Sequence, residues 1–182
     1  LKGFAIDRYP LAVCAAGALI AYLEQTQHTG LGNICSISRI DENKFVWMDK
    51  FTFRNLEVFQ SNAGKDGVSL VDTIDRCCSP MGSRMLREWL AMPLMDIDGL
   101  NARYDVVGLL RDNEELRSDL RDCIGGVGDL ERIISRAATG RILPREVRQL
   151  GRSLEQMQPI VSLCSNTGVA SLDKLLSGMK DT

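Results

Sequence analysis

The apolar and polar positions divide the chain into a mixed first part and a long helical part that follows Val68. An alanine-rich apolar run, 11–23, predicts a buried helix that begins at Pro10, because proline is tolerated in a first helical turn. The run is shorter than the ~20 apolar residues that cross a bilayer, so we predict no membrane span.

After this helix the pattern changes to a period of two. Residues 34–40 imperfectly alternate apolar and polar side chains and are rich in β-branched residues, which favours a strand. Residues 41–43 are typical of a turn, and 44–49 resemble a second strand. The sequence therefore predicts a small hairpin, followed by a short helix within 51–60 and a loop at 61–67.

Beyond this loop, apolar residues recur at helical spacing almost to the end of the chain. Few aromatic residues and many Leu, Ile and Met side chains fit helix-on-helix packing. The pattern predicts helices over 69–76, 80–92, 97–111, 113–123, 129–139, 144–164 and 169–179. Capping chemistry marks several starts: Ser79 before Pro80, Asp112 with Glu115 as a capping box, and Pro144 with Glu146 in the first turn.

The stretch 79–94 has a proline near each end and an apolar stripe between them. The stripe runs along one broad face of the predicted helix and consists of Met81, Met85, Leu86, Trp89 and Leu90. Gly82 permits close approach on that side, whereas Arg84, Arg87 and Glu88 lie mainly away from it. Pro93 ends the helix by excluding Met92 from helical geometry. We therefore expect Trp89 to anchor the core rather than to stack on a base.

Composition and charge exclude several functions. The net charge of −2 gives no general attraction to nucleic acid or membranes. The six cysteines form no CxxC pair and His28 has no cysteine nearby, so no metal site is predicted. Unpaired cysteines without a signal peptide indicate a reducing, cytosolic setting.

No phosphate-binding loop is predicted. Lys65 is followed by Asp66 and not by Ser or Thr, and Phe59 stands where the motif needs its first glycine. The glycine-rich run 125–129 leads into a helix but follows no strand, and we interpret it as a helix–helix turn. The sequence therefore predicts no catalytic or cofactor-binding residue.

Two alternatives stay open at this point. Cys77 and Cys78 beside Arg76 are candidates for a reactive thiol pair, although structural cysteines fit the pattern better. Six arginines also recur at spacings of three to five residues, and such a row is suited to DNA phosphates. Acidic residues are interleaved, so a solvated face is the first interpretation and a DNA-backbone contact the alternative. The row is Arg132, Arg136, Arg141, Arg145, Arg148 and Arg152.

The run SLVDTIDRCCSPMGSRMLREWLAMPL, 69–94, resembles the start of the helical core in the MutS family of DNA mismatch-recognition proteins. Similar text flanks it at 11–19, at 53–57 (FRNLE) and at 127–133 (VGDLERI), so the resemblance runs in order through nearly the whole chain. The structural signature consists of Asp72, Pro80, Gly82, Arg84, Leu86, Trp89, Pro93, Asp129 and Arg132, together with the neighbouring Ser79, Met81, Ser83 and Leu90.

This resemblance implies a mainly α fold: a multi-helix core (lever) bundle, with a small N-terminal β hairpin and one helix from the end of an α/β connector domain. It implies that 1–28 end the connector domain, that 29–67 form a crossing segment, and that 68–182 form the first half of the helical core. The chain is then a fragment without the mismatch-reading Phe-x-Glu motif, the clamp or the ATPase.

The resemblance also implies a function. The full-length family protein binds mispaired DNA as a homodimer and uses ATP with Mg²⁺ to change state. In that cycle the core relays the change between the DNA-holding end and the ATPase end. We expect the fragment itself to be cytoplasmic, to hold neither site, to need no cofactor and to catalyse no reaction. We also expect it to self-associate through an exposed apolar helix face.

Overall fold

A computed structural model describes residues 9–26, 34, 44–165 and 167–180. Within these residues the regular structure is helical, which confirms the predicted mainly α class. The elements are α1 (Pro10–Gln25), α2 (Lys50–Asn55), η4 (Gly64–Asp66), α3 (Leu70–Ile74), α4 (Pro80–Ala91), α5 (Ile97–Asp112), α6 (Glu114–Gly125), α7 (Leu130–Ala138), α8 (Pro144–Glu155), α9 (Met157–Cys164) and α10 (Ala170–Lys180).

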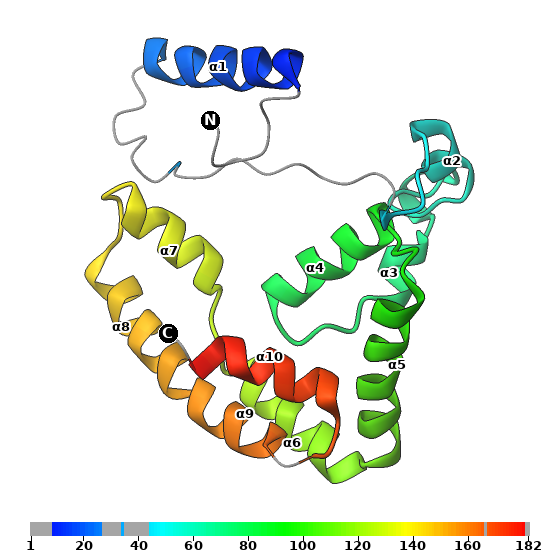
Figure 1. Ribbon diagram of the computed structural model, residues 1–182, viewed down its shortest axis with the longest axis vertical. Coiled ribbons are helices and arrows are strands. Elements are labelled where there is room, and N and C mark those ends of the chain that lie inside the picture. The colour runs from blue at the N-terminus through cyan, green and yellow to red at the C-terminus, as the bar shows by residue number, and fades with distance from the viewer. Residues whose placement is uncertain (1–8, 27–33, 35–43, 166, 181–182) are drawn as a thin grey trace.

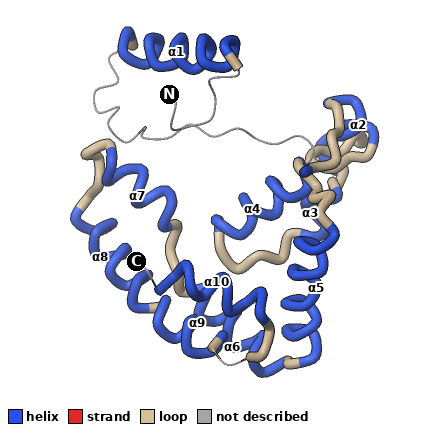
Figure 2. The backbone as a smooth tube through the Cα atoms, in the orientation of Figure 1, coloured by secondary structure: helices blue, strands red, loops and turns tan. Residues whose placement is uncertain are grey.

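The helices from α2 onward form two arms that diverge from a common base (Figures 1 and 2). One arm contains α2 to α5, and the other contains α7 and α8. The base consists of α6, α9 and α10: α9 packs on α6 and on α10, and α6 and α10 pack on α5. The short helix α4 leaves the first arm and extends toward the second, so a contact at its free end would join the two arms.

The core lies at the base. Four buried residues from three helices form its centre: Leu120 of α6, Cys164 of α9, and Leu172 and Leu176 of α10. Half-buried side chains of α5, α6 and α9 surround them, among them Leu109, Leu116 and Ile160. Helix α1 contributes nothing to this core, since none of its residues is buried. No helix of the described chain is long and apolar enough to span a membrane.

Side-chain caps determine several helix starts. Ser79 Oγ accepts a hydrogen bond from Gly82 N, as predicted. Asp129, predicted only as the first residue of a helix, caps α7 by accepting from Arg132 N. One predicted cap is wrong. Asn113, not Asp112, caps α6 by accepting from Leu116 N, because α5 continues through Asp112 and Asn113 is the residue directly before α6 begins at Glu114.

The single helix predicted over 144–164 is also wrong, because α8 ends at Glu155 and α9 begins at Met157. Pro159 explains the break. It has no N–H to donate to the carbonyl of Glu155, and its ring would clash with that carbonyl in a continuous helix. In α9 the same proline stands in the first turn, where no donor is required.

The predicted hairpin falls largely on residues that the structure does not describe, since 35–43 lie outside the described ranges. The predicted second strand, 44–49, is described and pairs with the segment that follows α4. Phe45 forms an antiparallel bridge with Leu94, and Met95 N donates to the Lys44 carbonyl at 2.9 Å. The extended segment thus runs along the chain that follows α4.

The expectation that Trp89 anchors the core is wrong. Its side chain is 43% exposed, and the guanidinium of Arg103 on α5 lies 3.6 Å over the ring. Met85 on the same stripe is also exposed, whereas Met81, Leu86 and Leu90 are half-buried. A cation over an aromatic face is a surface contact that holds α4 against α5, not a packed core.

Candidate functional site

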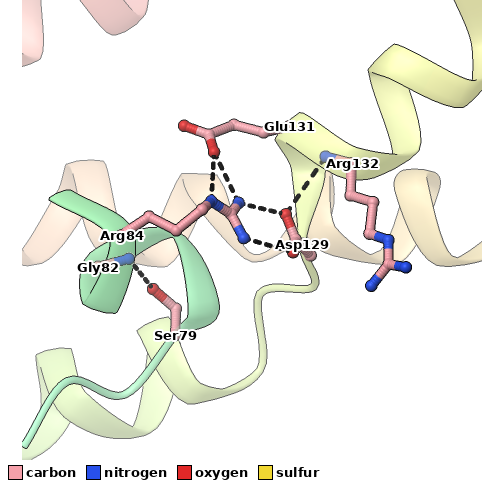
Figure 3. Close-up of polar contacts among 6 residues, drawn as sticks. All are labelled: Ser79, Gly82, Arg84, Asp129, Glu131 and Arg132. Carbon is pink, nitrogen blue, oxygen red and sulfur yellow. Dashed lines mark hydrogen bonds and ion pairs between the residues drawn. The ribbon is translucent and has the colours of Figure 1, made fainter. Parts of the chain in front are cut away.

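Arg84 on α4 joins the two arms through a cluster of three charged residues, hereafter the Arg84 cluster (Figure 3). Its guanidinium holds both oxygens of Asp129, with Nη2–Oδ1 at 2.7 Å and Nη1–Oδ2 at 2.9 Å. Nη2 and Nε also donate to Glu131 Oε2, at 2.6 and 3.0 Å. A bidentate arginine–carboxylate pair fixes direction as well as distance, so the end of α4 has a defined position on α7.

Local sequence chemistry aims these side chains at one another. Ser79 and Pro80 begin α4, which places Arg84 in its second turn at the free end. A side chain on Gly82 would lie 3.3 Å from Cys77 Cβ, so glycine lets the preceding loop lie close to the helix. On the other arm, Asp129 is held at the start of α7 by its own cap to Arg132 N at 3.2 Å.

The electrostatics of the cluster suit a structural contact and not an acid–base site. Arg84 cannot donate a proton at neutral pH, because its two carboxylate partners raise its pKa further above neutrality. Conversely, the hydrogen bonds from Arg84 lower the pKa of Asp129, with smaller help from Arg132 N. Arg84 and Asp129 therefore both keep their charge at neutral pH, and the cluster supplies attraction and geometry.

Substitution of Asp129 separates its two roles. Asn is as good an N-cap as Asp, so Asp129→Asn should keep α7 but lose the ion pair, whereas Asp129→Ala should also lose the cap, worth about 1 kcal/mol. The folded-state pKa of Asp129 is lowered, so its ionic stabilisation is complete above pH ~4 and is lost as pH falls below that value.

The unfolding free energy of Asp129→Asn should therefore depend less on pH between 3 and 5 than that of the unsubstituted chain. Urea unfolding followed by circular dichroism measures it. Asp119→Asn on the exposed side of α6 is the matched control. Identical pH curves for Asp129→Asn and the unsubstituted chain would rule out the ionic contribution.

Next to the cluster, a hydrogen bond joins the turn before α7 to α8. The buried Ser153 of α8 accepts a hydrogen bond from Gly128 N at 2.9 Å, directly before the capping Asp129. A side chain on Gly128 would lie 2.7 Å from Gln149 Nε2, so only glycine fits without a shift of that amide. The Arg84 cluster is thus connected to the whole second arm, not to a loose turn.

A second ion pair ties the other ends of these two helices. Arg136 Nη1 lies 3.0 Å from Glu146 Oε1, and Arg136 Nη2 donates to the Arg141 carbonyl. Glu146 also accepts from Leu143 N at 2.8 Å, which completes the first turn of α8. Glu146, predicted for that turn, therefore binds both the Leu143 N–H and the Arg136 guanidinium.

The predicted arginine row is not one continuous site. Arg136 is used in the tie between α7 and α8, and Arg132 lies next to the Arg84 cluster, where Figure 3 shows its side chain directed away from Arg84. Elsewhere in the row, the exposed side chains make no hydrogen bond or ion pair within the described residues; these are Arg141, Arg145, Arg148 and Arg152.

The signature residues have structural partners. Asp72 accepts from the Ser69 hydroxyl at 2.6 Å in a capping box that the sequence analysis did not predict, although the S-x-x-D spacing signals it. The Pro93 carbonyl accepts from Val46 N at 2.7 Å. Sequence reasoning also missed Glu131 and Ser153, and no local signal marks either one as a partner of a distant helix.

The thiol alternative loses support. Burial, and then the neighbouring Asp75 carboxylate, raise the pKa of Cys77, which is the opposite of thiolate activation. Burial likewise raises the pKa of Cys164 in the core. Among the described residues, no group of His, Cys, Asp and Glu side chains is placed to hold a metal ion.

Comparison with known proteins places this framework in a family. The sequence profile of MutS domain III matches residues 51–180. The chain therefore belongs to the MutS family, and the two motifs that meet in the Arg84 cluster both lie in that domain.

Curated relatives agree with this assignment. The chain is 46% identical over 169 residues to the DNA mismatch repair protein MutS of Christiangramia forsetii, covering 91% of this chain and 19% of that protein. It is 43% identical over 175 residues to that of Parabacteroides distasonis, covering 96% and 20%. The chain thus spans about a fifth of the length of the curated relatives that it matches.

Proposed function

We propose that this chain is the relay part of a mismatch-recognition ATPase, joining the end that holds DNA to the end that hydrolyses ATP. The full-length protein would bind mispaired double-stranded DNA as a homodimer and use ATP with Mg²⁺. In this proposal residues 1–28 end the connector domain, 29–67 cross into the core, and 68–182 form the first half of the helical core.

The Arg84 cluster is the observation that carries the proposal. Two arms that share only a base would move independently, because nothing would transmit a displacement from one to the other. The bidentate ion pair between Arg84 and Asp129, which are 45 positions apart, connects the two arms so that they move as one unit. The contact between Gly128 and Ser153 extends this connection from α7 to α8. A relay needs such an element with defined joined and separated arrangements.

Replacement of the matching segment in the C. forsetii relative by this chain, with or without Arg84→Gln, tests the relay. We expect both chimeras to bind a mispaired duplex equally. On ATP addition, the Arg84→Gln chimera should release the duplex at least about fivefold more slowly than the chimera that keeps Arg84. Stopped-flow anisotropy of labelled DNA measures the release rate.

Arg87→Gln on the same helix is the matched control, because Arg87 is exposed and forms no side-chain hydrogen bond or ion pair within the described chain. Equal ATP-driven release from the Arg84→Gln and Arg87→Gln chimeras would refute the relay role of the cluster.

We propose further that the chain alone has no enzymatic activity. We also propose that it binds no cofactor and that it acts in the cytoplasm. A phosphate-release assay checks the first point, since ATP turnover by the purified chain would contradict it.

The chain alone should also self-associate through an apolar row on α5. Ile97, Tyr104 and Val107 share one face of that helix and are 71%, 64% and 61% exposed. An exposed row of this kind favours association. Sedimentation velocity at increasing concentration measures it, and a chain that stays monomeric at high concentration would contradict it.

A further inference from the structure

Helix α8 presents three arginines on a single face. Arg145, Arg148 and Arg152 follow one another at steps of three and four residues, which places them within one side of an α-helix. The residues of α8 that turn inward are Glu146, Leu150 and Ser153, and all three are buried or half-buried. We call the outward side, defined by the three arginines, the α8 arginine face.

Ion pairing elsewhere leaves this face positive although the chain as a whole is slightly acidic. Two of the nearby carboxylates, Asp129 and Glu131, are engaged by Arg84, and the carboxylate of Glu146 is engaged by Arg136. Within α8 only Glu155 remains to oppose the three arginines, and none of the three has an ion-pair partner in the described chain. The tertiary structure, not the composition, creates the excess charge.

The chemistry of the face fits a phosphodiester backbone better than an acidic protein surface. A protein partner needs an apolar or aromatic centre, and the exposed apolar residues of α8, Val147 and Leu154, lie on a different side of the helix. Guanidinium groups need no such centre to bind phosphate oxygens. From Arg145 to Arg152 the helix rises ~10.5 Å, roughly the axial length of three phosphates of one strand.

We propose that the α8 arginine face is a contact surface for the phosphate backbone of double-stranded nucleic acid, independent of base sequence and of mispairing. This goes beyond the relay function, because it assigns the segment a direct contact with nucleic acid.

The test is anisotropy of a fluorescent duplex titrated with the full chain from 20 to 200 mM salt. We expect the logarithm of the binding constant to fall with that of salt with a slope near −2.7, about 0.9 for each of three phosphates. Arg148→Gln should reduce the slope by about 0.9, and the triple Arg145→Gln, Arg148→Gln, Arg152→Gln variant should abolish binding.

The matched control removes three exposed cations elsewhere, with Lys50→Gln, Arg87→Gln and Lys174→Gln. It changes the net charge equally and should keep the slope of the unsubstituted chain. Melting curves by circular dichroism verify that both triple variants fold.

Each contrary result overturns the proposal. Equal losses in the two triple variants would mean that bulk charge alone binds DNA. Competition by poly-glutamate as effective as that by unlabelled duplex would assign the face to acidic proteins. Preference for a mispaired duplex would require base or distortion readout, and absence of binding at 20 mM salt would exclude the contact.

Discussion

Replacement of Leu120 by alanine is expected to lower the free energy of unfolding of this chain by about 2–5 kcal/mol. Leu120 is 7% exposed and lies at the centre of the core, against Cys164 of α9 and Leu172 and Leu176 of α10. Truncation removes the burial of the side chain and leaves a cavity that three helices cannot close together.

Urea unfolding followed by circular dichroism at 222 nm measures this effect. Leu175→Ala on α10 removes the same atoms from a side chain that is 64% exposed, and it should change the free energy by less than about 0.5 kcal/mol. If the two substitutions cost the same, the base is not the core of the molecule, and the arms would need another source of stability.

Replacement of Ser153 by alanine is expected to cost about 1–3 kcal/mol, the second-largest effect predicted. Ser153 is 1% exposed and its hydroxyl is the acceptor for Gly128 N, so alanine would leave a half-buried donor without a partner. Because this bond holds the turn before Asp129, the substitution should also weaken the Arg84 cluster.

The same unfolding experiment measures Ser153→Ala, and Ser118→Ala provides the control, because Ser118 is an exposed residue of α6. A double substitution with Arg84→Gln adds a further check. If the two changes are coupled through the turn, their combined effect should be smaller than the sum of the separate effects. Strict additivity would show that the turn and the ion pair are independent.

Much of the helical framework could be predicted from the sequence because helix starts are local chemistry. The cap at Ser79 needs only residues within one turn, and Pro93 ends α4 as predicted. The failures at Asp112 and Pro159 are also local. Asn113 caps α6 because α5 extends through Asp112, one residue further than predicted, and an otherwise continuous apolar pattern concealed the effect of Pro159.

The site itself was beyond sequence reasoning for a different reason. Arg84 and Asp129 were both recognised as signature residues, but their separation along the chain gives no indication that they meet. The error at Trp89 has the same origin. A helical stripe shows which face of α4 is apolar, yet only the tertiary arrangement shows that Arg103 covers the ring.

The oxygen that Asp129 uses for its cap is also the one it offers to Arg84. Oδ1 accepts from Arg132 N at 3.2 Å and from Arg84 Nη2 at 2.7 Å. Fraying of the first turn of α7 and separation of the arms are therefore not independent fluctuations, since each frees the acceptor that the other holds in place. Local unfolding at this helix end and large-scale opening of the frame belong to one cooperative unit.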